Sequence, residues 1–312
     1  MADNEDDIAR ARAALRGIDM FQGDNVDMFL IKRLGGLTNL VYRVASGASV
    51  YCLRIAGEGT EEYIDRSVEA HNAAAAAAAG VSPEVLYVDA ASGLMVSRFL
   101  DGTRTMTPDL FQSTPGAPAR AAEAFHKLHT SGETFEFRFE LFSMIDEYLK
   151  VLATKQTDLP EGYHDVLGEA GKVRAALDAH PAKLAPCHCD PLSENFLDTG
   201  AKMWIVDWEY SGMNDPLWDL GDLSVEAGFS PAHDEEMMAA YFPTGASEAE
   251  WGRMIIYKAM CDLLWTLWGL IQHANNNPVE DFWAYSTGRF DRCKALMASS
   301  AFAGHVAAVA MG

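Results

Sequence analysis

The sequence predicts an α+β protein in which a small lobe with a five-stranded sheet precedes a larger, mostly helical lobe. Two patterns support this prediction. Short apolar runs separated by turn residues fill the first hundred residues, whereas helical periodicity dominates the rest of the chain. In addition, a polar hairpin interrupts the helical half. We therefore divide the chain into a first lobe, residues 1–100, and a second lobe, residues 101–312.

In the first lobe, three strand-like runs are followed by a helix and then by two further strands. Turn sequences such as GGLT and SGA separate the first three runs. The helix is rich in alanine, a strong helix former, and a glycine ends it. The expected strands span 28–34, 39–45, 49–56, 84–89 and 94–100, and the expected helix spans 61–80.

The second lobe begins with a stretch rich in Pro, Gly and Thr, residues 101–118, which is typical of a linker. Beyond this stretch the periodicity is helical. The expected helices span 117–130, 138–154, 163–179, 216–228, 232–242, 247–274 and 278–298. The tail after residue 299 is rich in Ala and Gly, and we expect it to add little chemistry.

Composition narrows the classes of partner. The 312 residues carry a net charge of −21, which argues against nucleic acid and against an anionic membrane as partners. The start MADNEDDIAR is acidic where a signal peptide would be basic and then apolar. The apolar segment 254–272 contains Lys258 and Asp262, so a buried helix is expected there rather than a membrane span. We expect no membrane association.

The five cysteines are odd in number and scattered, which predicts a reducing compartment and a cytoplasmic location. Cys187, His188 and Cys189 lie close together and raise the question of a zinc site. No second Cys/His pair lies at ligand spacing, however, so zinc is not favoured.

One segment, CHCDPLSENFLDTGAKMWIVDWE (187–209), places several oxygen-bearing side chains around a hairpin. NFL and MWIV are strand-like, and DTG between them is a turn signal. Asp190 and Asn195 precede the first strand, and Asp207 ends the second. Because a hairpin brings its two ends together, these three side chains are expected to meet. Two carboxylates and an amide suit a hard cation such as Mg²⁺, which leaves room for phosphates.

The spacing of these residues matches a phosphoryl-transfer site. In such sites one Asp accepts the proton of the substrate hydroxyl, while an Asn and a second Asp hold Mg²⁺. Asp190 is therefore the predicted base, and Asn195 and Asp207 are the predicted metal ligands. The alternative is that all three are polar loop residues that only solvate a hairpin.

Two features of the first lobe complement the hairpin. Small residues and free backbone N–H groups in GGLTN (35–39) can approach phosphate oxygens, although hairpin turns look similar. Arg54 lies in the third strand, and Glu69 on the next helix is its candidate ion-pair partner. A surface charge at a strand edge is the alternative for Arg54. The predicted phosphate-binding residues are Gly35, Gly36, Thr38, Asn39 and Arg54.

Together these motifs resemble the choline/ethanolamine kinases, within a larger group that includes aminoglycoside phosphotransferases and shares the protein-kinase fold. The resemblance covers residues 30–292. GGLTN resembles the family's phosphate loop, HCDPLSEN its catalytic loop and IVDWEYSGMNDPLWDLGDLSVEAGF (205–229) its extended metal-binding segment. AFHKLH (124–129) is similar to a helix of the wider group. The family usually has Arg where protein kinases have Lys, and the resemblance implies that His188 supports the loop.

The resemblance also implies a substrate site. LWTLW (264–268) looks like the Trp-x-x-Trp of the choline site, and its tryptophans, three residues apart, share a helical face. Aromatic faces with a carboxylate suit a quaternary ammonium, which cannot donate a hydrogen bond. From the residues alone, an aromatic core stripe is the alternative. The implied substrate residues are Glu209, Tyr210, Glu226, Trp265 and Trp268.

These features predict a bilobal, protein-kinase-like enzyme that uses ATP and Mg²⁺ to phosphorylate the hydroxyl of choline or a related amino alcohol. A kinase for ethanolamine, thiamine or an aminoglycoside is the first alternative. A non-catalytic choline-binding pseudokinase is an alternative of a different class, although a protein that only binds choline has no need of Asp190, Asn195 and Asp207 together. The expected partners are ATP and a small amino alcohol, and a homodimer is left open.

Overall fold

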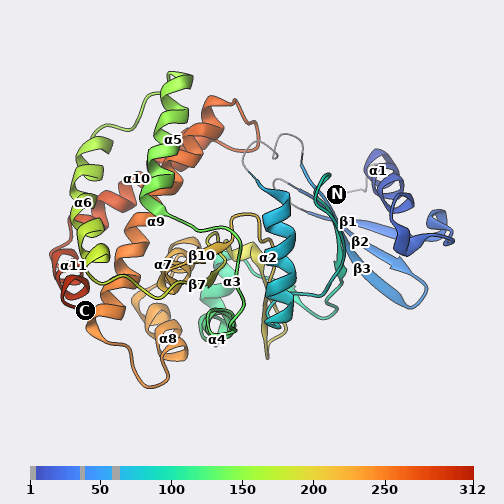
Figure 1. The fold of residues 1–312 in the computed structure, drawn as a ribbon, viewed down its shortest axis with the longest axis horizontal. Coiled ribbons are helices and arrows are strands. Elements are labelled where there is room, and N and C mark those ends of the chain that lie inside the picture. The colour runs from blue at the N-terminus through green and yellow to red at the C-terminus, as the bar shows by residue number, and fades with distance from the viewer. Residues whose placement is uncertain (1–4, 36–38, 58–63) are drawn as a thin grey trace.

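The computed structural model describes residues 5–35, 39–57 and 64–312 (Figure 1). The first lobe contains an antiparallel sheet whose strands lie in the order β1-β2-β3-β5-β4. This arrangement confirms the five expected strands and the α+β class. The strands are β1 (Leu30–Gly35), β2 (Leu40–Ser46), β3 (Ser49–Ile55), β4 (Val85–Asp89) and β5 (Leu94–Arg98).

A helix that was not predicted, α1 (Glu5–Arg16), packs against this sheet. Three acidic residues occupy its first turn and a basic residue occupies its last turn. These charges interact favourably with the helix dipole and stabilise the helix. Ala11 and Leu15 of α1 are fully buried and share the small lobe's core with Tyr42 and Leu53 of the sheet. The apolar stripe of α1 is therefore narrow, which explains why periodicity alone does not reveal it.

The alanine-rich helix α2 (Arg66–Ala78) lies between the sheet and the helical lobe (Figure 1). It begins later than expected, at a cap formed by Asp65, whose side chain accepts hydrogen bonds from the backbone of Ser67 and Val68. Ala73 and Ala76 of α2 belong to the core of the larger lobe. These small side chains allow a close approach, so α2 is fixed to both lobes.

The stretch expected to be a linker contains two short elements, β6 (Arg104–Thr105) and α3 (Pro108–Ser113). Thr107 caps α3 by accepting a hydrogen bond from the backbone of Leu110, and Pro108 occupies the first helical position. β6 pairs with β8 of the hairpin, more than ninety residues further along the chain. The stretch is thus anchored to the second lobe.

The second lobe contains all seven expected helices and, besides the short α3, a further helix, α11, which packs against α9 and α6. Phe302 and Val309 of α11 are buried in the core, so the Ala- and Gly-rich tail contributes to the packing of the lobe. The helices are α4 (Ala117–His129), α5 (Leu141–Lys155), α6 (Tyr163–Ala179), α7 (Pro216–Glu226), α8 (Pro231–Tyr241), α9 (Glu248–Ala274), α10 (Phe282–Met297) and α11 (Phe302–Met311).

The long helix α9 runs through the middle of this lobe and packs against α5, α7, α10 and α11. By length and composition α9 is apolar enough to cross a membrane, and the bent pair α10–α11, with a 72° break, passes the same test. However, 78% of the apolar window of α9 is buried inside the protein, as a core helix would be. Gly221 of α7 allows a close crossing, since a Cβ there would lie 2.7 Å from the carbonyl oxygen of Met254.

Two small sheets in the second lobe hold the polar segments. The predicted hairpin is present as β8 (Phe196–Asp198) and β9 (Met203–Ile205), and β6 extends it to three strands. β7 (Ala185–Cys187) pairs with β10 (Gly212–Asn214). The catalytic-loop segment leaves β7, and the segment with Asp207 leaves β9, so the two sheets place both segments side by side.

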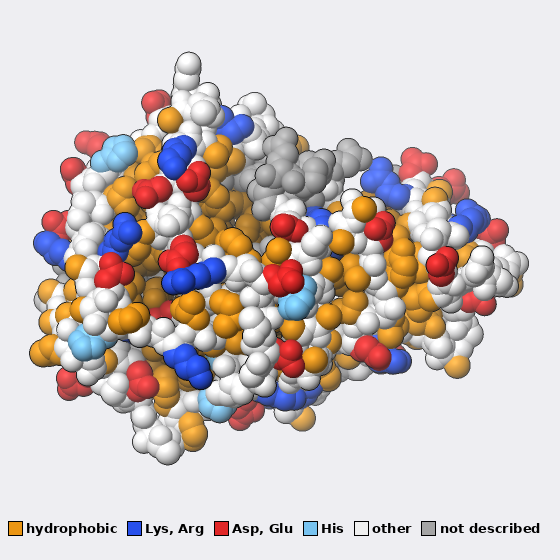
Figure 2. All heavy atoms as spheres, viewed as in Figure 1, with side chains coloured by type: hydrophobic (Ala, Val, Ile, Leu, Met, Phe, Trp, Pro, Cys, Tyr) orange, Lys and Arg blue, Asp and Glu red, His pale blue; other side chains and the backbone are white. Residues whose placement is uncertain are grey.

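Charge is distributed over the surface. On the face drawn in Figure 2, acidic and basic side chains are mixed over both lobes. Exposed ion pairs, such as Arg98 with Glu84 and Lys150 with Glu147, occur on the surface of the protein. Exposed pairs of this kind contribute only about 0–1 kcal/mol each.

Candidate active site

Asp190 lies in the loop between β7 and β8, and its carboxylate has no ion pair within the described ranges. Hydrogen bonds within the loop stabilise its turn. The Asp190 carbonyl accepts one from the backbone N–H of Leu192, at 2.8 Å, and one from the side-chain Nδ2 of Asn195, at 3.2 Å. Burial raises the pKa of Asp190 to about 7; the negative charge of Glu226 adds to this shift and Arg289 opposes it. A buried carboxylate with a pKa near neutrality can accept a proton from an alcohol.

His188 supports this loop, as expected. Burial lowers the pKa of its imidazole. Nε2 lies 2.9 Å from the Val206 carbonyl oxygen, and Nδ1 accepts from the backbone N–H of Asp190 at 3.4 Å. In the neutral ring, Nε2 is therefore the donor and Nδ1 the acceptor. The ring ties the Asp190 loop to the end of the second hairpin strand.

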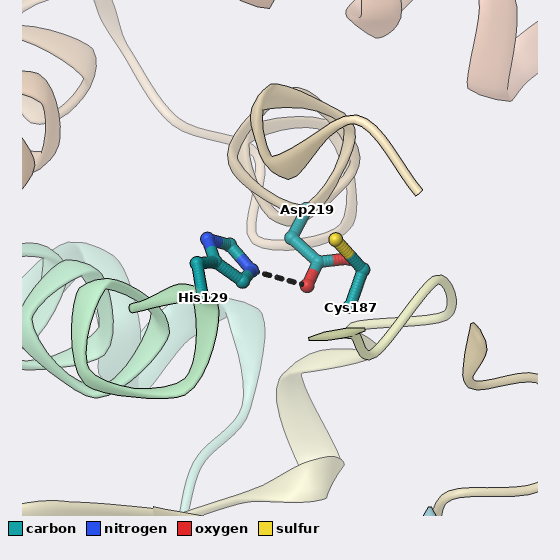
Figure 3. Close-up of side chains that lie close together, drawn as sticks. All are labelled: His129, Cys187 and Asp219. Atoms are coloured by element: carbon teal, nitrogen blue, oxygen red, sulfur yellow. Dashed lines mark hydrogen bonds and ion pairs between the residues drawn. The ribbon is translucent and has the colours of Figure 1, made fainter. Parts of the chain in front are cut away.

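Asp219 of α7 anchors the same loop from the other side. Its two oxygens accept the backbone N–H groups of His188, at 2.7 Å, and of Cys189, at 2.8 Å. His129 of α4 lies beside this carboxylate, with Nε2 3.0 Å from Oδ2 (Figure 3). Cys189 has a positive φ of 67°, so the loop holds a backbone conformation that these hydrogen bonds must support.

His129, Cys187 and Asp219 lie close enough together to raise the question of a metal site (Figure 3). Each group already has another role, because His129 Nδ1 lies 2.8 Å from the hydroxyl of Tyr241 and the Asp219 oxygens serve the backbone. Burial raises the pKa of the Cys187 thiol, which keeps it protonated and a poor ligand. In the described structure, the cluster is a hydrogen-bond network.

Asn195 and Asp207, the predicted metal ligands, are brought together by the hairpin. Phe196 pairs with Ile205, and the backbone N–H of Val206 donates to the Asn195 carbonyl at 2.9 Å. Asp207 follows directly, with a positive φ of 70° that turns it out of the strand. The hairpin therefore brings the backbones of Asn195 and Asp207 side by side.

The chemistry of these two side chains fits Mg²⁺. Oδ1 of Asp207 is buried and has no hydrogen-bond partner in the described part of the chain. Burial raises the pKa of Asp207, the charge of Glu209 adds to the shift and the charge of Arg54 opposes it, so the ionised carboxylate is only partly compensated. Glu69 and Glu209 also lie close to Asp207, but arginines already bind both. Asn195 and Asp207 thus remain the oxygen donors for a hard cation.

Arg54 and Glu69 form the expected ion pair. Two guanidinium nitrogens of Arg54 contact the two carboxylate oxygens of Glu69, one of them at 3.0 Å. Arg66, at the start of α2, donates to Glu69 at 2.8 Å and also to Glu209. Sequence reasoning missed Arg66, which joins the small lobe to the segment that follows Asp207.

The structure describes only the two ends of the predicted phosphate loop, Gly35 and Asn39. Gly36, Leu37 and Thr38 lie outside the described residues. Gly35 ends β1. The side chain of Asn39 donates to Glu209 at 2.9 Å and accepts from the backbone of Gly57 at 3.3 Å, so it joins the lobes rather than standing free for a phosphate.

Three of the predicted substrate residues form one aromatic cluster. The rings of Tyr210 and Trp265 meet edge to face, with centroids 5.6 Å apart, and the indole N–H of Trp268 donates to the Tyr210 hydroxyl at 3.1 Å. Phe282 and Tyr285 of α10 pack edge-on against Trp268. The two tryptophans thus share a face of α9, as expected, and residues of α10 complete the cluster.

The two predicted substrate carboxylates have other partners. Glu209 faces the small lobe, where Asn39 and Arg66 bind it, so its expected placement with the tryptophans is wrong. Glu226 pairs with Arg289 of α10 at 2.5 Å. Asp222, one turn before Glu226 on α7, was missed: its Oδ2 accepts from the Trp265 indole N–H at 3.3 Å.

The fold defines the protein-kinase-like class. The structure of a thermostable mutant of the aminoglycoside phosphotransferase APH(4)-Ia has the same fold (18% identity, TM-score 0.62, covering 91% of this chain and 100% of that one). The family description "Choline/ethanolamine kinase" matches residues 31–251. The chain belongs to the choline/ethanolamine kinase family.

Two solved structures are particularly similar. A choline/ethanolamine kinase family protein from Mesorhizobium loti is 62% identical, with a TM-score of 0.90, and covers 98% of this chain and 100% of its own. The choline kinase LicA from Streptococcus pneumoniae is 25% identical, with a TM-score of 0.73, and covers 89% of this chain and 97% of its own. A further structure of LicA is a complex with AMP.

Proposed function

We propose that this protein is an ATP- and Mg²⁺-dependent kinase that phosphorylates the hydroxyl of choline or a closely related amino alcohol. Family membership supports a kinase, and the AMP complex of LicA supports nucleotide as a co-substrate. We also propose a cytoplasmic location, which is compatible with the five free cysteines, four of them buried.

The observation that carries the proposal is the position of Asp190. Its carboxylate, with a pKa raised to about 7, is close enough to Asp222 and Glu226 for their charges to act on one another. Its backbone carbonyl accepts a hydrogen bond from the side chain of Asn195, one of the two residues assigned to the metal. Carboxylates near the base can bind a cation, and the residues assigned to the metal adjoin the same loop. This combination suits an amino alcohol. Such a substrate has a positive nitrogen at one end and a reacting hydroxyl at the other.

In this scheme each group has a separate task. Asp190 orients the hydroxyl and accepts its proton as the oxygen attacks the terminal phosphorus of ATP, and the bond between that phosphorus and the departing ADP breaks. Arg54, fixed by Glu69, contacts the phosphate oxygens, and Asn195 and Asp207 hold the metal. Mg²⁺ supplies positive charge that neutralises the phosphates during transfer. The aromatic cluster on α9 and α10 surrounds the cationic end of the acceptor.

Ethanolamine, thiamine and aminoglycosides remain alternative acceptors, and a choline-binding pseudokinase is the non-catalytic alternative. A coupled assay of ADP release should compare all four acceptors, with Mg²⁺ omitted in one arm and with Asp190→Asn in another. We expect turnover of choline or ethanolamine that needs both Mg²⁺ and Asp190. Binding of choline without ADP release by pure protein would favour the pseudokinase, and turnover of only thiamine or an aminoglycoside would move the acceptor to that class.

A further inference from the structure

Four carboxylates gather where α7, α9 and α10 meet near the Asp190 loop, and two arginines of α10 lie among them. Asp190 belongs to the loop, Asp222 and Glu226 to α7, and Asp262 to α9. The arginines are Arg289 and Arg292. Two negative charges therefore remain after the two positive charges are counted, and the contacts identify which carboxylates carry them.

The arginines are committed to Glu226 and Asp262. Arg289 contacts Glu226 at 2.5 Å and Asp262 at 3.1 Å, and it also lies over the ring of Tyr285, with 4.6 Å between Cζ and the ring centroid. Arg292 donates to both oxygens of Asp262, at 2.7 and 3.0 Å. Glu226, the carboxylate that the family resemblance places in the substrate site, is thus already neutralised from within the chain.

Asp222 has no direct contact with an arginine in the described part of the chain. It is fully buried, at 0% exposure, and its Oδ1 has no hydrogen-bond partner within the described residues. Its other oxygen has only the long contact with the indole of Trp265. Buried polar atoms almost always have a partner, so an orphaned oxygen beside a substrate site needs an explanation. Burial raises the pKa of Asp222, the nearby charges of Glu226 and Asp190 add to the shift, and Arg289 opposes it from a distance. An arriving cation in direct contact would therefore stabilise the ionised form.

We propose that Asp222 is the residue that receives the positively charged nitrogen of the acceptor, while Arg289 keeps Glu226 neutralised. The two carboxylates that no described arginine contacts directly then serve the two ends of one molecule, Asp190 the hydroxyl and Asp222 the nitrogen. This inference rests on the proposed function, because it names the side chain that selects a cationic alcohol over a neutral one of the same shape. Selection arises from charge, since a neutral alcohol would leave the buried carboxylate uncompensated.

The test compares each amino alcohol with its uncharged isostere. Choline is paired with 3,3-dimethylbutan-1-ol and ethanolamine with propan-1-ol, and kcat/KM is measured for the pair that the wild type uses better. Where an isostere is turned over too slowly, its inhibition constant against the amine replaces kcat/KM. The variants are Asp222→Asn, which keeps the shape and removes the charge, and Glu226→Gln. Asp291→Asn is the matched control, because Asp291 is an exposed residue of α10 paired only with Lys294.

We expect Asp222→Asn to lower the preference for the cation by about ten- to a hundredfold, with the KM for ATP unchanged. Glu226→Gln should lower this preference much less, and Asp291→Asn not at all. An unchanged preference in Asp222→Asn, or a larger loss in Glu226→Gln, overturns the inference while the proposed function stands. If Asp222→Asn fails to fold, Asp222→Ser replaces it and is judged by the same criterion. If the wild type turns over no amino alcohol, the proposed function fails and this inference fails with it.

Discussion

Arg54 and Glu69 form a buried, two-pronged ion pair that joins the middle of the small sheet to helix α2. Glu69 is 2% exposed and also accepts a hydrogen bond from Arg66, so it has a cationic partner on each side. Because α2 packs into the core of the larger lobe, the pair fixes the Arg54 guanidinium relative to Asp207 across the lobes. The position of the arginine is thus set by both lobes.

This geometry predicts a graded response at position 54. Arg54→Lys retains the charge but loses the planar fork, so we expect a partial loss of kcat/KM for ATP. Arg54→Ala should lose more, about ten- to a hundredfold, since a charged hydrogen bond contributes about 1.5–3 kcal/mol. In both variants Glu69 still has its ion pair with Arg66, so the thermal midpoint of unfolding should fall only modestly. Equal activity of the lysine, alanine and wild-type proteins would remove Arg54 from phosphate binding.

Most of the fold could be predicted because its signals are local. The five strands of the first lobe and the eight expected helices follow from apolar periodicity and from turn residues within each segment. Two of the elements that were missed depend on distant partners. β6 is two residues long and exists because β8 pairs with it, and α11 is an alanine-rich segment that becomes part of the core only through α9 and α6.

Asp190 should be indispensable for turnover but not for nucleotide binding. Asp190→Ala removes the group that orients the hydroxyl and accepts its proton, and general-base catalysis contributes about two to four orders of magnitude. We expect kcat to fall by this amount while the dissociation constant for ATP stays near that of the wild type. Steady-state kinetics together with nucleotide titration would measure both quantities. Near-normal turnover by a pure preparation would exclude Asp190 as the base.

Asp207 should link nucleotide affinity to Mg²⁺. Asp207→Asn replaces one anionic oxygen by an amide N–H₂, which cannot bind a hard cation. ATP binding measured with Mg²⁺ should weaken much more than binding measured with EDTA. Asp291→Asn, which removes an exposed charge from the same lobe, should leave both values unchanged. A Mg²⁺ titration of Asp207→Asn that overlays the wild type would contradict the metal assignment.

Asp219 should control the catalytic loop without touching substrate. In Asp219→Asn, one acceptor for the backbone N–H groups of His188 and Cys189 becomes a donor, which leaves a buried N–H unpaired at a cost of about 1–3 kcal/mol. We expect a lower thermal midpoint and a lower kcat, with KM for ATP little changed, because only the Asp190 loop is displaced. His129→Gln retains a donor toward Asp219 and should be milder. Loss of ATP affinity equal to the loss of kcat would mean that the whole lobe is disturbed.

The site was less predictable than the fold, and the reasons are specific. The hairpin brings Asn195 and Asp207 together through contacts that the spacing already implies. The partners of Glu209 lie 170 and 143 residues away in the small lobe, so nothing near Glu209 in the sequence shows where it points. Asp222 gains its position beside Trp265 only because α7 crosses α9 closely at Gly221.

The tryptophans of α9 should determine affinity for the acceptor. A trimethylammonium group is weakly hydrated and cannot donate hydrogen bonds, so aromatic faces bind it well, each contributing about 2 kcal/mol in a desolvated cage. Trp268→Ala should therefore raise KM for choline by roughly thirtyfold and leave KM for ATP unchanged. Trp265 is 4% exposed, and its replacement by alanine opens a cavity, so Trp265→Phe is the informative change at that position.

Trp283 provides the matched control for these variants, because it lies at the surface of α10, beside His273 and 38% exposed. Trp283→Ala should change neither KM. The competing view is that the cluster is only core and that the carboxylates serve a primary amine. That view predicts better turnover of ethanolamine than of choline, together with cluster variants that lose stability but keep the KM for choline. Far better turnover of ethanolamine by the wild type would by itself reject the aromatic cage as a choline site.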